Sequence, residues 1–515
     1  MESGIVGVRA ASAAGKTRWG AAGYCAPGGT LTNQGMMGVL RPLSGPRGST
    51  MRTVDVLFLI EHVDRELDAA SCIVEMLERR FAISADIRNY YSDMLFCLGR
   101  YQPAIVVTPF CYFLDHHPIK DYAAAWPKAL FFNMAWEQIL YRMNETVKVP
   151  KDPFARERVH HVCWTRKYRD FIAGLGADQD KLHLTGNPVM RFYDAPYKDY
   201  FATRRQLASR YGLDAGRKWI LFPENYRWAF LSEAQMAAFV AQDASPDHLA
   251  AARQYCVRSL TALFATLQEL RRADDPLVIL RPRPATSADE MTAFMHKAAP
   301  HGAPNVRIIK GESAREWILA ADHVISSYST TLIEAAIAGK PLHVFSPEPF
   351  PEALADEWYR YAPLLRSGQE LLAAIRAPGR KAASAHLEAW ARETLLPIGD
   401  PVQIIAERIA ALRRALPNYG RQSTADHKRL WTGQILIETG RKWLQSRRRY
   451  HEYLRRRDRR YAFTLNKHEK DVFGAHDVAR RIARWRALVS TAGNNEACPD
   501  QEVLHASGDG RRPTS

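Results

Sequence analysis

Two arginines in the second half of the chain are suited to hold a phosphate. Arg281 and Arg283 follow an apolar run at 277–280 and alternate with prolines, which stiffen the turn. A guanidinium group can donate two parallel hydrogen bonds to a phosphate or carboxylate. The competing interpretation is a surface turn whose arginines are solvated.

A second group that favours phosphate lies in the polar turn 326–331, which precedes an apolar helical pattern at 332–337. Unpaired backbone N–H groups and the helix dipole favour an anion at the start of a helix. We therefore expect phosphate contacts from the last three hydroxyl residues of the turn, Ser329, Thr330 and Thr331. The alternative is that these hydroxyls only cap the helix.

Three further polar residues are expected at the same site. Glu334, near the start of that helix, is within reach of a ribose hydroxyl, and Glu224 and Asn225 follow the buried run 219–222. Ligands of open α/β sheets bind at the carboxyl ends of the strands, so turns after successive strands are expected to converge on one cleft. An ordinary loop with packed aromatic rings is the alternative for the stretch that begins at Glu224.

Acidic side chains near strand ends in the first half of the chain are candidates for a proton acceptor. Glu61 ends the first apolar run and Glu137 follows the fourth, while Glu66 and Asp68 lie close to Glu61. Deprotonating a hydroxyl needs a carboxylate or His within hydrogen-bond reach. Glu61 and Glu137 are the two preferred candidates, in no order, and each could instead cap a helix or pair with an arginine.

Two sheets are needed to position these residues. Apolar runs predict strands at 54–60, 83–87, 104–108, 129–133, 161–165 and 182–185, and again at 219–222, 277–280, 306–309, 324–325 and 342–345. Strands that alternate with helical patterns indicate parallel sheets with crossover helices. We predict an α/β fold with two Rossmann-like doubly wound domains, 51–205 and 206–380, that face a cleft and are followed by crossover helices at 381–417.

Basic residues gather at the two ends of the chain. The net charge of +16 divides into +4 over 1–50, +2 over 51–417 and +10 over 418–515. A nearly neutral body argues against nucleic-acid binding, which needs a basic patch on the fold. We expect a disordered leader at 1–50, a basic helical extension at 418–490 and a disordered tail at 491–515.

Within the extension, the stretch 421–460 interleaves arginines with aromatic residues. It suits either contact with an anionic membrane surface or packing on the body. No apolar run approaches the length needed to span a bilayer. The seven cysteines are scattered without a CxxC pair, so neither a zinc site nor a disulfide framework is expected, which fits a reducing cytoplasm.

Three motifs are similar to those of one superfamily: the strand–turn–helix–strand segment 322–345, Pro-Glu-Asn-Tyr at 223–226 and Gly-Asn-Pro at 186–188. They resemble the GT-B glycosyltransferases, and among these the bacterial surface-carbohydrate (polysaccharide) biosynthesis proteins. The resemblance covers roughly residues 53–415 and much of the tail.

The resemblance implies transfer of a sugar from a nucleotide-sugar donor to a glycan or lipid-linked acceptor, in the cytoplasm or at the inner face of its membrane. It implies donor binding in the second domain, with Asn187 of the Gly-Asn-Pro turn in the donor set, acceptor binding in the first domain, no cofactor and no metal. Related transferases have the sequence Arg/Lys-Pro-His-Pro at the position of residues 281–284, and this chain has Arg283 in place of the His. That difference favours a charge clamp on the leaving phosphate over an acid.

Three rival functions stay open at this stage. A UDP-sugar 2-epimerase shares the fold, but a Gly-rich turn is expected before its helix in place of 326–331. A transferase that uses a CMP-linked donor such as CMP-Kdo suits the position of the two arginines. A non-catalytic glycan-binding or scaffold protein on the same fold is the rival from another class, and the missing His at Arg283 keeps it open.

Overall fold

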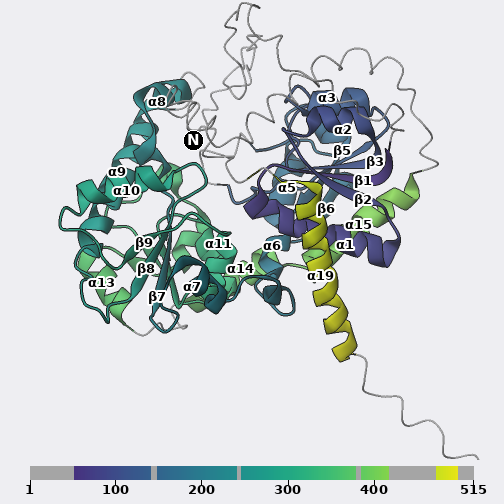
Figure 1. The fold of residues 1–515 in the computed structure, drawn as a ribbon. Coiled ribbons are helices and arrows are strands. Elements are labelled where there is room, and N and C mark those ends of the chain that lie inside the picture. Colours follow the sequence, from purple (N-terminus) through teal and green to yellow (C-terminus); the bar gives the residue numbers. More distant parts are fainter. Residues whose placement is uncertain are drawn as a thin grey trace, which may run out of the picture.

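The computed structural model describes residues 52–140, 148–240, 245–377, 384–416, 471 and 473–496. They form two α/β domains side by side, with a C-terminal helix against the first of them (Figure 1). The predicted leader and the basic, aromatic stretch 421–460 lie outside the described residues.

The first domain is built on a parallel sheet with the strand order β2-β1-β3-β4-β5-β6. Its strands are β1 (Arg52–Ile60), β2 (Ala85–Asn89), β3 (Tyr101–Thr108), β4 (Leu130–Asn133), β5 (Val159–Cys163) and β6 (Leu182–Leu184). All six predicted strands form, with the second shifted by two residues towards the C-terminus and the fifth by two residues towards the N-terminus. β1 and β3 are buried on both faces, as central parallel strands are, and this explains their unbroken apolar runs.

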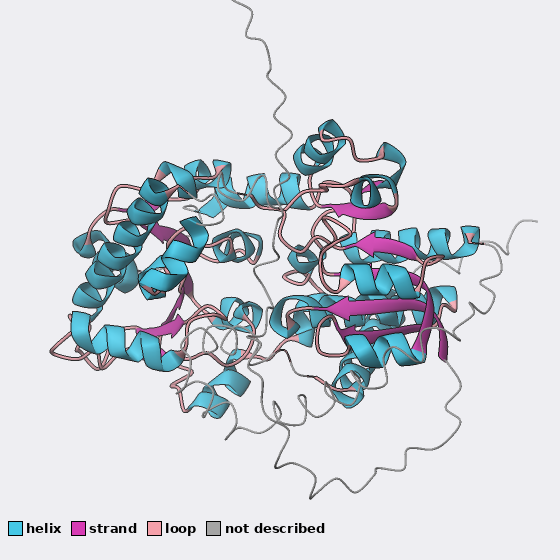
Figure 2. Cartoon of the chain, turned by 90° about the horizontal axis from the view of Figure 1, so that it is seen from above, coloured by secondary structure: helices cyan, strands magenta, loops and turns pink. Residues whose placement is uncertain are grey.

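Helices cover both faces of this sheet (Figure 2). They are α1 (Asp68–Phe81), α2 (Met94–Arg100), α3 (Ile119–Ala125), α4 (Pro153–Glu157) and α5 (Arg166–Gly174). One turn of π-helix, η1 (Val63–Leu67), joins β1 to α1 at the carboxyl end of the sheet. Turns of π-helix are rare in proteins, and many of those that occur lie at functional sites.

The second domain has a second parallel sheet, with the strand order β12-β11-β10-β7-β8-β9. Its strands are β7 (Trp219–Pro223), β8 (Leu277–Arg281), β9 (Val306–Ile308), β10 (His323–Ser326), β11 (Leu342–Phe345) and β12 (Leu364–Leu365). The first five match the prediction. β12 is an additional edge strand of two residues, too short to leave an apolar pattern in the sequence.

Seven helices accompany this sheet: α7 (Arg204–Tyr211), α8 (Glu233–Val240), α9 (Pro246–Leu267), α10 (Ala288–Ala298), α11 (Ala314–Ala320), α12 (Thr331–Ile337) and α13 (Gly368–Arg376). Capping boxes begin α7, α10 and α11, since in each a Ser or Thr and a Glu or Gln three residues later exchange hydrogen bonds. The prediction of an α/β fold with two Rossmann-like doubly wound domains is confirmed.

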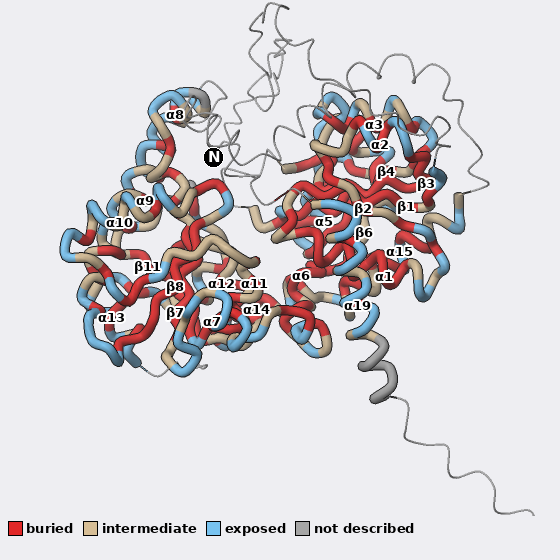
Figure 3. The backbone as a smooth tube through the Cα atoms, viewed as in Figure 1, coloured by how far each residue is buried: buried red, intermediate tan, exposed pale blue. Residues whose placement is uncertain are grey.

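The chain returns to the first domain twice. α14 (Ala385–Leu395) packs on α12, and α15 (Pro401–Ala415) then crosses to α1, where Arg413 Nε lies 2.6 Å from Asp55 Oδ1. The last described helix, α19 (Ala475–Glu496), also packs on α1 and extends past the boundary predicted at 490. Figure 3 shows the resulting buried layers, which run through both sheets and the helices between them.

Candidate functional site

The strand order of the second domain marks where a ligand should bind. Chain connections run outward in opposite directions from the neighbouring strands β7 and β10, so the sheet has its switch point there. In doubly wound sheets, ligands bind in the crevice outside the carboxyl ends of the strands at this point. The turns that leave β7 and β10 are those that carry Glu224–Asn225 and Ser326–Thr331.

Hydrogen bonds hold the turns of the second domain together. The Glu224 backbone N–H donates to the Arg281 carbonyl at 2.9 Å, and the Glu224 carboxylate accepts from the backbone N–H of Arg283 at 3.1 Å and from that of Tyr226. Asn225 Nδ2 donates to the Tyr328 carbonyl at 3.4 Å. The turns after β7, β8 and β10 therefore form one connected surface.

Both oxygens of the buried Glu224 carboxylate accept hydrogen bonds from these backbone N–H groups. Burial raises the pKa of this carboxyl group, while Arg283 opposes the shift. Glu224 positions Arg283 through the backbone of its turn. Glu224 and Asn225 thus lie where the sequence placed them, and donor binding by either stays a prediction.

Arg281 connects the two domains. Its Nη2 lies 3.0 Å from Asp64 Oδ2 in η1 of the first domain and donates to the Glu312 carbonyl at 2.7 Å. The Arg281 side chain is only 8% exposed, and that of Asp64 is 28% exposed. Burial lowers the pKa of Arg281, and Asp64 counteracts this effect.

The hydroxyls predicted to hold phosphate lie at the start of α12. Ser329 Oγ and Thr331 Oγ1 are hydrogen-bonded to each other, and Ser329 Oγ accepts the Thr331 backbone N–H at 3.3 Å. Thr330 is exposed and its side chain makes no capping bond. Ser329 and Thr331 are partly buried, and phosphate binding by these hydroxyls stays a prediction.

Glu334 points to the boundary between the domains. Its Oε2 accepts the Tyr193 hydroxyl at 2.5 Å. Burial raises the pKa of Glu334, while Arg315 and Tyr193 oppose the shift. Arg315 is almost completely buried, lies over the rings of Phe192 and Phe201, and places Nη1 3.6 Å from Asp68 Oδ2 of the first domain.

The two preferred carboxylates of the first domain meet at one arginine. Arg65 Nη1 lies 2.6 Å from Glu137 Oε1, and Arg65 Nη2 lies 3.5 Å from Glu61 Oε2 and 2.6 Å from Glu66 Oε1. Lys148 also pairs with Glu137. Desolvation alone would raise the pKa of Glu137, but Lys148 and Arg65 together lower it far below its usual value.

Asn187 lies at the joint between the domains. Its backbone N–H donates to the Leu395 carbonyl at 2.8 Å, and its side chain accepts the Val189 N–H at 3.0 Å to cap α6 (Pro188–Arg191). Gly186 before it has φ +83°, and a Cβ there would lie 2.8 Å from the Leu395 carbonyl oxygen. These contacts give Asn187 a structural role, and donor binding by Asn187 stays a prediction.

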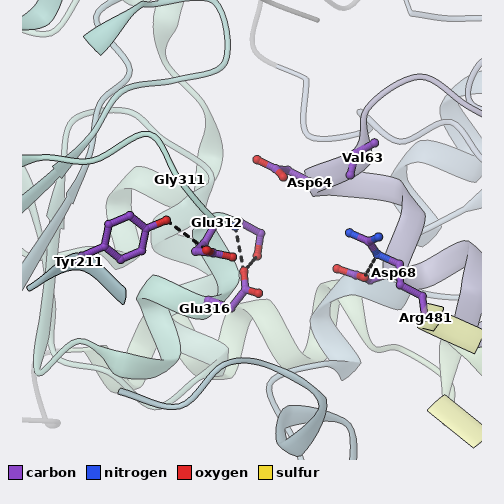
Figure 4. A pocket seen from close by; sticks show the side chains of 9 residues that line it. Val63, Asp64, Asp68, Tyr211, Gly311, Glu312, Glu316 and Arg481 are labelled. Atoms are coloured by element: carbon purple, nitrogen blue, oxygen red, sulfur yellow. Dashed lines mark hydrogen bonds and ion pairs between the residues drawn. The ribbon is translucent and has the colours of Figure 1, made fainter. Parts of the chain in front are cut away.

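A polar cavity of about 220 Å³ lies between the domains. Figure 4 shows Asp64, Asp68 and Arg481 on one side of it and Tyr211, Glu312 and Glu316 on the other. Arg481 comes from α19, so the C-terminal extension contributes to the wall of this interdomain cavity. Asp68 Oδ1 accepts from Arg481 Nε at 2.9 Å and from the Tyr200 hydroxyl at 3.1 Å.

Sequence reasoning missed four residues of this region: Asp64, Arg65, Arg315 and Arg481. Asp64 and Arg65 lie inside the charged stretch after the first strand, so the strand-end rule that selected Glu61 extends to them. Arg315 follows β9 in the same way. No local signal marks Arg481, because its place at the cavity depends on the return of α19.

Within the described ranges, no three His, Cys, Asp or Glu side chains are grouped so that they could share a metal ion. In the same part of the chain, no helix is both long and apolar enough to cross a bilayer.

Comparison with known proteins gave similarities to solved structures only, since no family model and no curated protein matches the sequence. The chain is similar to a variant of the wall teichoic acid polymerase TagF, with 12% identity and a TM-score of 0.48 over 71% of this chain and 90% of that one. It is also similar to the UDP-GlcNAc 2-epimerase from Neisseria meningitidis bound to UDP-GlcNAc, with 13% identity and a TM-score of 0.46 over 70% and 100%.

A third similar structure is the S. aureus MnaA complex with UDP, with 10% identity and a TM-score of 0.45 over 71% of this chain and 98% of that one. At these scores and identities, none of the three similarities by itself assigns an activity to this chain.

Proposed function

We propose that this protein is a glycosyltransferase-like enzyme of bacterial surface polysaccharide assembly. It transfers a sugar from a nucleotide-sugar donor to a glycan or lipid-linked acceptor. The second domain binds the donor, and the first domain presents the acceptor. A lipid-linked acceptor would place the reaction at the cytoplasmic face of a membrane, with 421–460 as the segment predicted to touch anionic headgroups.

The observation that carries this proposal is the position of Arg281. It ends β8 beside the switch point of the second sheet and reaches the turn that ends β1 of the first sheet. A buried guanidinium between the carboxyl ends of two doubly wound sheets is suited to an anionic ligand held between the domains. Arg283 and the hydroxyls of Ser329 and Thr331 lie on the connected turns beside it.

The transfer step follows from these positions. The acceptor hydroxyl attacks the anomeric carbon, the bond from that carbon to the phosphate oxygen breaks, and the electron pair leaves with the nucleotide. Arg281 and Arg283 stabilise the negative charge that develops on the leaving phosphate. Charge stabilisation by fixed donors in a partly dry site is commonly the largest contribution to such a step.

Glu61 is the better candidate to take the acceptor proton. Glu137 is held between Lys148 and Arg65, and its lowered pKa makes it a weak proton acceptor. Glu61 Oε2 lies 3.5 Å from Arg65 Nη2, a longer contact than the ion pairs that hold Glu137. We therefore assign the acceptor proton to Glu61, while Glu137 serves to fix Arg65.

A thermal-shift screen with UDP, GDP, CDP, CMP and dTDP tests the donor site. A nucleotide present at a hundred times its dissociation constant stabilises the native state by about 2.7 kcal/mol. We expect one nucleotide to raise the melting temperature of the wild type but not that of Arg283→Ala. Arg283 suits this test because the Glu224 carboxylate contacts its backbone N–H, which the substitution keeps.

The matched control is Arg205→Ala, which removes an exposed arginine of α7 and should keep the wild-type response. Glu334→Ala is a poorer test, because it also breaks the contact with Tyr193. No shift with any of the five nucleotides, from a folded sample, would contradict the transferase proposal and favour a glycan-binding protein of the same fold.

A further inference from the structure

The guanidinium group proposed to hold the donor phosphate already has an anionic partner. Arg281 Nη2 lies 3.0 Å from Asp64 Oδ2, and the two residues belong to different domains. Arg281 Nε is buried and, within the described ranges, has no hydrogen-bond partner. The guanidinium group therefore keeps an unused donor while its Nη2 is occupied by Asp64 and by the Glu312 carbonyl.

The cavity beside this ion pair is smaller than a usual ligand site. It holds about 220 Å³ and is lined by Asp64 and Glu312, among others. Sites for small organic ligands usually hold about 300–1,000 Å³. Arg281 does not line this cavity and its side chain is only 8% exposed, so a phosphate that reaches the guanidinium group must displace the Asp64 carboxylate.

Other contacts cross the same boundary. Arg315 Nη1 lies 3.6 Å from Asp68 Oδ2, and the Tyr193 hydroxyl donates to Glu334. These contacts hold the domains together without occupying Arg281. The Asp64 contact differs from them because it places a carboxylate on the atom that a phosphate would need.

We propose that Asp64 is an internal counter-ion that occupies Arg281 and is displaced by the phosphate of the donor. The identity of the anion rests on the proposed function; the competition itself does not. Asp64 thereby lowers the affinity for anions. A guanidinium group that must first release its carboxylate binds phosphate with an affinity reduced by the fraction of molecules in which the ion pair is broken.

The test is isothermal titration of the full-length protein with inorganic pyrophosphate. Asp64→Asn keeps the shape of the side chain and removes its charge, and we expect pyrophosphate to bind about tenfold more tightly than to the wild type. In an Arg281→Gln background, Asp64→Asn should leave the affinity unchanged, since the two residues act on one contact. If Asp64→Asn does not fold, Asp64→Ser is the second variant, because its hydroxyl still accepts one N–H.

The matched control is Glu357→Gln. It removes another carboxylate that pairs across the domains, since Glu357 Oε2 lies 2.8 Å from Lys167 Nζ, but it does not touch Arg281. Its pyrophosphate affinity should match that of the wild type. Unchanged or weaker binding by Asp64→Asn, equal tightening by Glu357→Gln, or no pyrophosphate binding by any variant would overturn the inference.

The outcome is separable from that of the donor proposal. Tighter binding of pyrophosphate to Asp64→Asn, with no binding of any nucleotide, would support the counter-ion and contradict the nucleotide-sugar donor. If a nucleotide binds and Asp64→Asn leaves its affinity unchanged, the donor proposal would be supported and the counter-ion contradicted.

Discussion

Trp485 is the residue that docks α19 onto the first domain, and its removal should detach the helix while the body stays folded. The indole is fully buried and stacks on Tyr200, with ring centroids 3.8 Å apart and an interplanar angle of 7°. Its Nε1 donates to the Asp68 carbonyl at 3.0 Å. The neighbouring Arg481 pairs with Asp68 and lines the interdomain cavity.

The expected cost follows from these contacts. Truncating a buried Trp to Ala typically costs about 3–5 kcal/mol. That figure includes the lost apolar burial, the stacking, which contributes about 1 kcal/mol, and the hydrogen bond, which contributes a similar amount. Because each 1.4 kcal/mol is a factor of ten, Trp485→Ala should reduce the docking equilibrium of α19 by about a thousandfold.

Hydrogen exchange followed by mass spectrometry measures this directly. Because most of a helix's stability in a protein comes from tertiary packing, the amides of 475–489 should lose most of their protection in Trp485→Ala, while the strands of both sheets keep theirs. Arg480→Ala is the matched control on the same helix, since its side chain is 61% exposed and, among the described residues, its ion-pair partner is Asp477 in the same turn. Unchanged protection of 475–489 in Trp485→Ala would refute the reasoning, and so would an equal loss in Arg480→Ala.

Two further predictions concern stability. Gly186→Ala should lower the free energy of unfolding by about 2–4 kcal/mol, since a Cβ would meet Leu395 and Pro401 at a residue with positive φ. Gly302→Ala, which also has positive φ but open space around it, should cost only about 1 kcal/mol; equal urea midpoints for the two would contradict the close-contact argument. Burial lowers the pKa of His161 from 6.5 to about 4, so the unfolded chain binds the proton first and stability falls as pH drops from 6.5 towards 4. His161→Asn should flatten this fall by about 1.4 kcal/mol per pH unit, and an unchanged slope in urea titrations would show that His161 is not the group that titrates.

Most of the fold could be predicted from local sequence patterns. A central strand of a parallel sheet is covered by helices on both faces, so it needs apolar residues at nearly every position, and the run 54–60 therefore predicts a buried strand without identifying its neighbours. The alternation of runs and helical patterns predicted both domains. It missed β12, because two residues with one exposed side chain, Leu364, leave no pattern to read.

The sequence alone also determined which turns would meet, because the carboxyl ends of parallel strands lie on one edge of the sheet. That rule correctly placed Glu224, Arg281 and Arg283 on one connected surface. It did not determine what each side chain does there. The direction of the Glu224 carboxylate, into its own framework, depends on backbone N–H groups contributed by two different turns.

Only the tertiary structure decided the charge partners between the domains. Arg281 and Asp64 are 217 residues apart in the chain, yet their side chains lie 3.0 Å apart. The same holds for Asp68 and Arg481, which meet because α19 returns to α1. Ion pairing acts over a few ångströms and is set by how two folded bodies pack, and no pattern of neighbouring residues records that packing.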